Sequence, residues 1–138
     1  MANSCDNQPI RLVLALADEL SGIVGHAAKA AGLTPQQARV LMHLEEPRRM
    51  CELADQQSLD PSSITSLVDR LERDGLVLRE PDSADGRVRR VALTAVGLQT
   101  RTRFFAEFTA QPDPFAALTP EQRRALVERL GSTGEQLV

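Results

Sequence analysis

The chain has 138 residues, of which 42% are hydrophobic and 25% are charged, values that are ordinary for one globular domain and argue against disorder or a fibrous repeat. Its longest apolar run near the amino end, Leu12 to Ala17, is far shorter than the roughly 18 residues of a membrane span, and no basic segment precedes it. We therefore expect a cytoplasmic protein that does not enter a membrane.

The formal net charge is -3, but the charge is unevenly distributed along the chain. Between Asp82 and Arg103, five arginines stand against two aspartates. Contacts with phosphate groups depend on the local field rather than on the sum over the chain. An acidic total therefore does not exclude a nucleic-acid partner.

Two helices are predicted in the amino-terminal third. From Ile10 to Ala31 apolar residues recur with helical spacing, and the first turns are apolar on nearly every face, so more than one side has to be covered. A second helix is expected to stop before Pro47. Thr34 is expected to cap it, with Pro35 at its first position and Gln37 closing a capping box.

The next segment has the pattern of a helix-turn-helix. A short third helix is predicted from Met50 to about Gln57, followed by a turn at residues 58–60. Asp60 is expected to cap a fourth helix that begins at Pro61 and ends at Gly75, in the left-handed conformation that glycine adopts most easily. Two helices joined in this way can place the second one in a major groove of DNA.

A hairpin and two further helices follow. Residues 76–80 and 88–93 are predicted as paired strands, and the turn-rich residues 81–86 between them form an exposed wing. Thr94 is expected to cap a helix of about 18 residues ending near Pro112, and a capping box at Thr119 opens the last helix. The predicted fold class is mainly α with a small β wing, a winged helix-turn-helix with flanking helices.

The fourth helix has two distinct faces. Its apolar stripe consists of Ile64, Leu67, Val68 and Leu71. The remaining faces carry small hydroxyl side chains and arginines that can approach base edges or phosphates. These candidate DNA-binding residues are Ser62, Ser63, Thr65, Ser66, Arg70 and Arg73. The alternative is that the serines and the threonine only cap the helix, and that both arginines pair with Asp69, Glu72 or Asp74 on a solvated face.

The wing supplies two further candidates for DNA binding. Arg87 follows the hairpin tip, and Asp85 is expected to orient its guanidinium through a bidentate contact. An arginine oriented in advance suits the negative potential of a narrow minor groove. The alternative is a hairpin turn with a surface ion pair of little energetic weight.

The sequence offers no catalytic or metal site. It has no nucleophile elbow, phosphate loop or metal-ligand spacing, and its two cysteines, Cys5 and Cys51, do not form a CxxC pair. His26 and His43 are isolated on helical segments. We therefore expect no enzyme activity, no cofactor and no structural disulfide. Cys51 follows two arginines, which would activate an exposed thiol; the alternative is a half-buried residue that only fills the packing.

Several motifs occur together between Leu53 and Gly97. They are Glu-Leu-Ala, Leu-Asp-Pro-Ser, Ser-Leu-Val-Asp-Arg-Leu-Glu, Asp-Gly-Leu-Val, Asp85-x-Arg87 and Leu93-Thr94-x-x-Gly97. With these motifs the chain resembles the MarR family of bacterial transcription regulators, and the flanking helices fit the same architecture.

The resemblance implies a homodimer whose winged domains bind a pseudo-palindromic operator in double-stranded DNA. Residues 33–97 would form the DNA-binding domain, and residues 1–32 and 98–138 the helical dimerisation region. Many such regulators are repressors that small phenolic or aromatic acids release. Within the family pattern, the groove-facing positions are Ser62, Ser63, Thr65, Ser66 and Arg70, and the wing positions are Asp85 and Arg87.

The chain departs from the family pattern at two places. Arg49 stands where the family often has a serine or threonine that caps the third helix. Peroxide-sensing members carry a reactive cysteine inside the first helix with tyrosine partners, whereas Cys5 precedes that helix and the chain has no tyrosine.

Three hypotheses follow. The leading one is a dimeric DNA-binding repressor released by a small-molecule effector, whose binding residues the sequence does not identify. The alternatives are a redox-responsive regulator that uses Cys51 or Cys5, and a winged-helix module that binds another protein.

Overall fold

Helices dominate residues 7–136, the part of the chain that the computed structural model describes. The elements in chain order are α1 (Gln8–Ala30), α2 (Pro35–Met42), β1 (Arg48–Arg49), α3 (Met50–Gln57), α4 (Pro61–Arg73), β2 (Val77–Pro81), β3 (Arg89–Leu93), α5 (Ala95–Thr109) and α6 (Pro120–Gln136). The three strands form an antiparallel sheet in the order β1-β3-β2. This arrangement confirms the predicted winged helix-turn-helix fold class.

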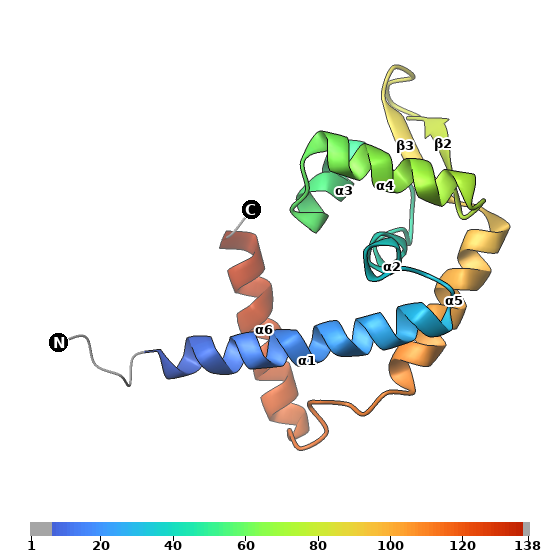
Figure 1. Cartoon of the computed structure of the whole chain (residues 1–138). Helices are drawn as coiled ribbons and strands as arrows, with labels where there is room; N and C mark the ends of the chain where they lie inside the picture. The colour runs from blue at the N-terminus through green and yellow to red at the C-terminus, as the bar shows by residue number, and fades with distance from the viewer. Residues whose placement is uncertain (1–6, 137–138) are drawn as a thin grey trace.

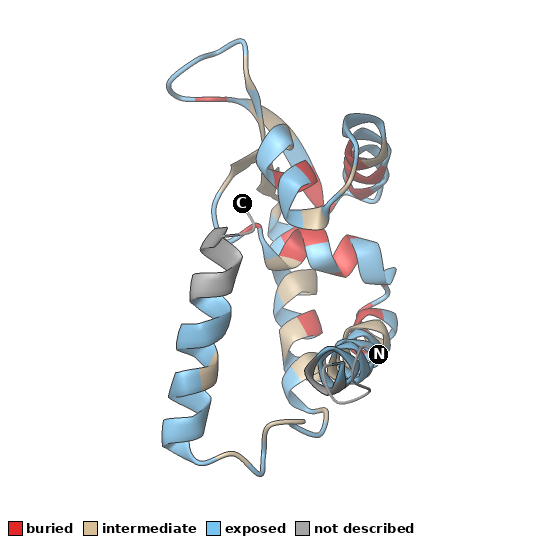
Figure 2. Ribbon diagram, turned by 90° about the vertical axis from the view of Figure 1, so that its left-hand side faces the viewer, coloured by how far each residue is buried: buried red, intermediate tan, exposed pale blue. Residues whose placement is uncertain are grey.

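Figure 1 shows α2, α3 and α4 grouped with the sheet beside the carboxyl-terminal end of α1. The amino-terminal half of α1 extends away from this group, and α6 lies to one side of it (Figure 1 and Figure 2). No helix among the described residues has the length and apolar character needed to cross a membrane.

The core lies where α2, α4 and the sheet meet the adjoining parts of α1 and α5. The predicted apolar stripe of α4 is buried, and Val91 of β3 and Phe104 of α5 are fully buried beside it. Burial of this stripe fixes which face of α4 remains available to solvent, because the helical period places the opposite positions outward.

Capping interactions define the helix starts as predicted. Thr34 and Gln37 form the capping box of α2: the N–H of Gln37 donates to Thr34 Oγ1 at 3.2 Å, and the N–H of Thr34 donates to Gln37 Oε1 at 3.0 Å. The side chain of Asp60 accepts from the N–H of Ser63 at 2.9 Å and so caps α4. Gly75 adopts a φ of +73° directly after this helix, as expected.

Two elements differ from the sequence prediction. Helix α5 begins after its predicted cap Thr94 but ends at Thr109 rather than near Pro112. The N–H of Gln111 donates to the carbonyl oxygen of Phe108 at 3.3 Å, so the last turn is tighter than an α-helix. Pro112 also disfavours helical geometry at the residue that precedes it. Strand β1 was not predicted, because two residues are too few to show an alternating pattern.

The Leu93-Thr94-x-x-Gly97 motif joins the end of α4 to the start of α5. The hydroxyl of Thr94 donates to the carbonyl oxygen of Gly75 at 2.6 Å and accepts from the N–H of Gly97 at 3.0 Å. A Cβ at Gly97 would lie 1.8 Å from the carbonyl oxygen of Leu76. Only glycine therefore fits this position without a backbone shift.

Large apolar side chains remain exposed on α1 and α6. They include Ile10, Leu12, Val13 and Leu14 of α1, and Val127 and Leu130 of α6. Val127 is 71% exposed. In Figure 2, α6 stands apart from α1 and α5 and is almost entirely exposed along its described length. A single protomer thus leaves apolar faces uncovered on both helices, including that of α1, which the sequence predicted to need covering on more than one side.

We expect Gly97→Ala to lower the free energy of unfolding by ~3 kcal/mol, the upper end of the cost of overpacking, because the clashing atom belongs to the backbone. Urea unfolding followed by circular dichroism at one protein concentration measures this change. Gly22→Ala is the matched control, since a Cβ there meets no atom within 4 Å, and it should stabilise α1 by ~0.5–1 kcal/mol. Equal stability of the Gly97→Ala variant and the unmodified chain would contradict the close approach.

Candidate nucleic-acid interface

The exposed face of α4 carries all six candidate residues predicted on this helix. Ser62, Ser66 and Arg73 lie opposite the buried stripe and are exposed. Ser63, which is half-buried, and Arg70, which is exposed, lie on one flank of this face. Thr65 is exposed on the other flank. The helical period that buried the stripe therefore also gathers these polar side chains.

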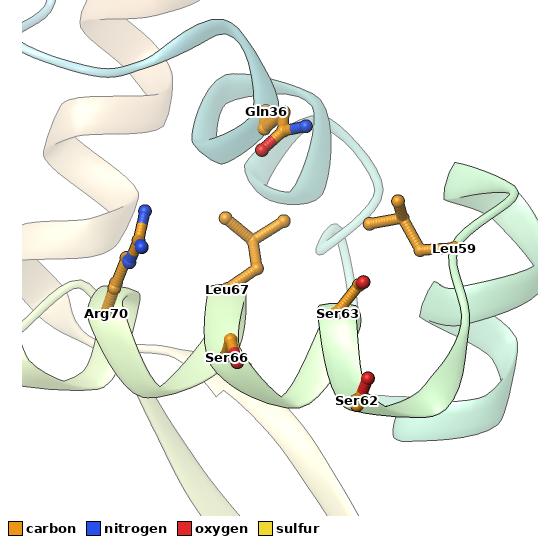
Figure 3. A pocket seen from close by; sticks show the side chains of 7 residues that line it. All are labelled: Gln36, Leu59, Ser62, Ser63, Ser66, Leu67 and Arg70. Carbon is orange, nitrogen blue, oxygen red and sulfur yellow. The ribbon is translucent and has the colours of Figure 1, made fainter.

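A shallow hollow of about 280 Å³ lies between α2 and α4 (Figure 3). Four of the candidate residues line it: Ser62, Ser63, Ser66 and Arg70. Gln36 of α2 faces them from the other side, and Leu59 and Leu67 complete the lining. Thr65 and Arg73 do not line this hollow. The surface is thus concave, and its three serines are short enough to allow close approach of a bulky ligand.

Most of the hydroxyl protons of this face are engaged within the protein. Ser62 Oγ donates to Asp60 Oδ1 at 2.6 Å, and Ser63 Oγ donates to Asp60 Oδ2 at 2.7 Å. Thr65 Oγ1 donates to the carbonyl oxygen of Pro61 at 2.7 Å. These three oxygens therefore present lone pairs to a ligand rather than protons. The hydroxyl of Ser66 has no hydrogen-bond partner among the described residues and can act in either role.

The two serine hydroxyls, with the backbone N–H of Ser63, hold the pKa of Asp60 well below its ordinary value. Because the folded-state pKa is lowered, the stabilisation of the α4 cap is present at neutral pH. It is lost as the pH falls below about 4 and through the lowered pKa. Asp60 is therefore ionised wherever the protein is folded near neutral pH.

The acids near the arginines of α4 are bound to other side chains. Arg79 of β2 pairs with Asp69, with 2.6 Å between Nη2 and Oδ1, and also with Glu72. Asp74 Oδ2 accepts from Gln37 Nε2 at 3.1 Å. Arg70 and Arg73 consequently form no ion pair among the side chains that the structure describes, contrary to the alternative in which those three acids neutralise them. Both side chains are exposed to solvent.

At the wing tip Asp85 contacts Arg87, but not in the predicted way. Asp85 Oδ1 accepts from the backbone N–H of Arg87 at 3.0 Å, and the carbonyl oxygen of Asp85 accepts from the N–H of Val88 at 3.0 Å. The carboxylate thus shapes the turn rather than orienting the guanidinium. In a tight turn, an aspartate side chain commonly accepts from the backbone N–H of the residue two positions later. The guanidinium of Arg87 is exposed and has no partner in the described part of the chain.

The base of the wing depends on residues that were not predicted as site residues. The carboxylate of Asp82 is buried and accepts from Arg49 Nε at 2.7 Å and from the N–H of Ala84 at 2.8 Å. The hydrogen bond to the Ala84 N–H and the bond to the guanidinium lower the pKa of Asp82. Arg49 makes no side-chain cap for α3; the contact at this helix start is the Arg49 N–H, which donates to Glu52 Oε2 at 2.9 Å. Arg49, the departure from the family pattern, was the one sequence signal available here.

Cys51, His26 and His43, the cysteine and histidines among the described residues, form no common site. Cys51 is exposed, so it is not the half-buried packing residue of the alternative interpretation, and Cys5 lies outside the described residues. Desolvation and the nearby Arg48 lower the pKa of His43. Within the described ranges, no three His, Cys, Asp or Glu side chains are grouped so that they could hold a metal ion.

Comparisons with known proteins agree with this geometry. Residues 33–88 match the model of the MarR family. The chain is 37% identical over 91 residues, 62% of its length, to the transcriptional activatory protein BadR of Rhodopseudomonas palustris. It is 35% identical over 68 residues, 48% of its length, to the HTH-type transcriptional repressor MdtR of Bacillus subtilis. These alignments cover 49% and 44% of the two relatives, so the chain spans about half the length of the curated relatives it matches.

The likeness to a solved structure extends over the whole fold. CouR from Rhodococcus jostii RHA1, solved bound to p-coumaroyl-CoA, superposes with a TM-score of 0.81 at 26% identity, covering 99% of this chain and 95% of that one. The family match lies on the winged helix-turn-helix, and the structural match includes the flanking helices. Residues 33–88 therefore match the MarR family model, and the chain as a whole shares the fold of CouR.

Proposed function

We propose that the protein regulates transcription by binding double-stranded DNA through α4 and the wing. The observation that carries this proposal is the state of Arg70, Arg73 and Arg87. Each is exposed and free of ion pairs among the described residues, although Asp69, Glu72 and other acids are nearby. Cations left unneutralised beside short polar side chains are what a phosphate-rich ligand requires.

The hydroxyl groups of α4 bear on which bases are read. Because Ser62 and Ser63 donate their protons to Asp60, their oxygens are available as acceptors. In the major groove, cytosine N4 and adenine N6 offer amino donors, whereas guanine and thymine offer acceptors at the corresponding edge. We therefore propose that the start of α4 favours cytosine or adenine, while Arg70 contacts guanine or a phosphate.

We further propose that the protein is a homodimer, with residues 33–97 as the DNA-binding domain and residues 1–32 and 98–138 as the dimerisation region. The support is the exposed apolar face of α1 and the isolation of α6 from the rest of the protomer. Helices with apolar side chains this exposed are stable when another surface covers them. Two copies related by a two-fold axis would present two α4 helices to a pseudo-palindromic operator.

The hollow that suits a small effector lies between α1, α2 and α3. It has a volume of about 540 Å³ and combines apolar side chains such as Leu20, Val24 and Met42 with the cationic Arg39. Its four apolar side chains, together with one arginine among six polar lining residues, suit a small aromatic or phenolic acid. Because α1 belongs to the proposed dimerisation region and α2 to the DNA-binding domain, an occupant would alter their relative position. We propose that this change releases DNA from a repressor, the activity named for MdtR.

Arg87→Ala is expected to weaken DNA binding about tenfold. It should also lower the slope of log affinity against log salt concentration by about one for each half-site, because each protomer loses one cation near the phosphates. The ligand is a DNA fragment selected from the source genome, and fluorescence anisotropy at several salt concentrations gives the affinity. Lys29→Ala, which removes an exposed cation of α1, is the matched control and should change neither quantity. If the wing serves to bind another protein instead, Arg87→Ala should change neither the DNA affinity nor its dependence on salt concentration.

Sedimentation at micromolar concentration tests the dimer. We expect about twice the chain mass of 15.1 kDa for the unmodified protein and a shift toward the monomer for Val127→Asp. Val127 is exposed in the single protomer, so its loss should act on association rather than on folding. Leu78→Asp, which places the same charge at an exposed apolar position of β2, should leave the dimer intact. A stable monomer of the unmodified chain would contradict the proposal.

Salicylate and p-coumaroyl-CoA are suitable probes of the effector hollow. Binding of either, measured by calorimetry, should be at least about tenfold weaker for Arg39→Gln, because the variant loses the one full cation of the lining. Arg103→Gln, an exposed cation of α5 outside the hollow, is the control. If both probes bind the Arg39→Gln variant as tightly as the unmodified protein, the hollow is not their site.

A further inference from the structure

We propose that Arg49 is a positioning residue for the wing: by holding Asp82, it fixes the hairpin relative to α3 and α4 so that Arg87 meets the DNA. This inference rests on the proposed function, since it names the residue that aims one of the proposed DNA contacts. It concerns a position where the chain departs from the usual capping residue of the family.

Arg49 is fixed on its backbone side by two elements. As the last residue of β1, it pairs with Arg90 of β3 in the sheet. Its N–H donates to Glu52 Oε2 at 2.9 Å in the first turn of α3. The side chain therefore starts from the junction of the sheet and the first helix of the helix-turn-helix, and it is a rigid origin for a contact to the wing.

Asp82 receives that contact at the point where the hairpin leaves the sheet. The last pair of the β2–β3 ladder joins Pro81 to Arg89, and Asp82 is the next residue. Its side chain is only 4% exposed and binds Arg49 Nε and the N–H of Ala84. Its own N–H donates to the carbonyl oxygen of Val88 at 2.8 Å on the opposite arm. One residue thus connects both arms of the wing to α3.

The charge of this pair makes the connection sensitive to substitution. Without Arg49, the carboxylate would stay buried with the Ala84 N–H as its remaining hydrogen-bond donor and Arg90 as its remaining nearby cation, and a buried charge that has lost its direct partner is strongly unfavourable. Opening of the wing base would relieve that cost by admitting water. Arg79 holds the middle of β2 on α4 through its own ion pairs, so the movement would be confined to the wing beyond Pro81. Arg87 lies in that part.

A double-mutant cycle on DNA binding separates positioning from direct contact. We expect Arg49→Ala and Asp82→Asn each to weaken binding of the selected fragment about tenfold. In an Arg87→Ala background, each should change the affinity less than about twofold, because the tip no longer carries the contact. Additive losses would mean that Arg49, whose guanidinium is partly exposed, touches the DNA itself. Unchanged affinity of Arg49→Ala would also overturn the proposal.

Amide hydrogen exchange supplies a readout that needs no DNA. In Arg49→Ala, exchange at Asp82 and Ala84 should accelerate at least about tenfold, while Val91 in the central strand keeps its protection. Arg123→Ala, which removes the Arg123–Asp113 pair of 2.6 Å outside the wing, is the matched control and should alter neither exchange nor affinity. If the unmodified protein binds no DNA fragment, the proposed function fails, and the exchange rates alone still decide whether Arg49 holds the wing. Unchanged exchange at Asp82 and Ala84 would overturn the inference.

Discussion

Arg79 of β2 binds two acids of α4, Asp69 and Glu72, and this interaction decides what α4 presents to a ligand. Both acids lie on or beside the exposed face, where their negative charge would repel phosphate and attract Arg70 and Arg73. With the acids bound by a residue from the sheet, the two arginines remain unpaired. The same ion pairs also fasten β2 to α4. The contacts of Arg79 therefore both leave Arg70 and Arg73 unpaired and fix the position of the hairpin on the helix.

The wing combines a fixed base with an unpaired tip. The base is connected to α4 through Arg79 and to α3 through Arg49 and the buried Asp82. At the tip, Asp85 contacts the backbone of Arg87 and leaves its guanidinium exposed. A rigid support limits where the tip can reach, while the side chain keeps the rotational freedom to follow a groove. A fixed base and an unpaired tip would together place the Arg87 guanidinium at one position on a ligand while leaving its charge without a partner inside the protein.

Local sequence patterns predicted much of this fold because caps and stripes depend on neighbouring residues. The capping box of Thr34 and the left-handed conformation of Gly75 were each predicted from a few neighbouring residues in the sequence. The contacts that shape the interface join distant residues instead, such as Arg49 with Asp82, and no periodicity records them. The role of Asp85 was mistaken for a related reason, since the Asp-x-Arg spacing fits a side-chain contact and a backbone contact equally well. The family motifs predicted which residues would face a groove, but they did not predict the contacts that hold those residues in place.

Hydroxyl-radical footprinting of the selected DNA fragment tests the central claim most directly, because it reports both α4 helices and both wings in one measurement. We predict two protected half-sites centred about 10 base pairs apart, each with protection of an adjacent minor groove where Arg87 reaches. Loss of Arg87 should remove the minor-groove protection and leave the half-sites. A fragment bound without two spaced half-sites, or with no protected minor groove, would contradict the account.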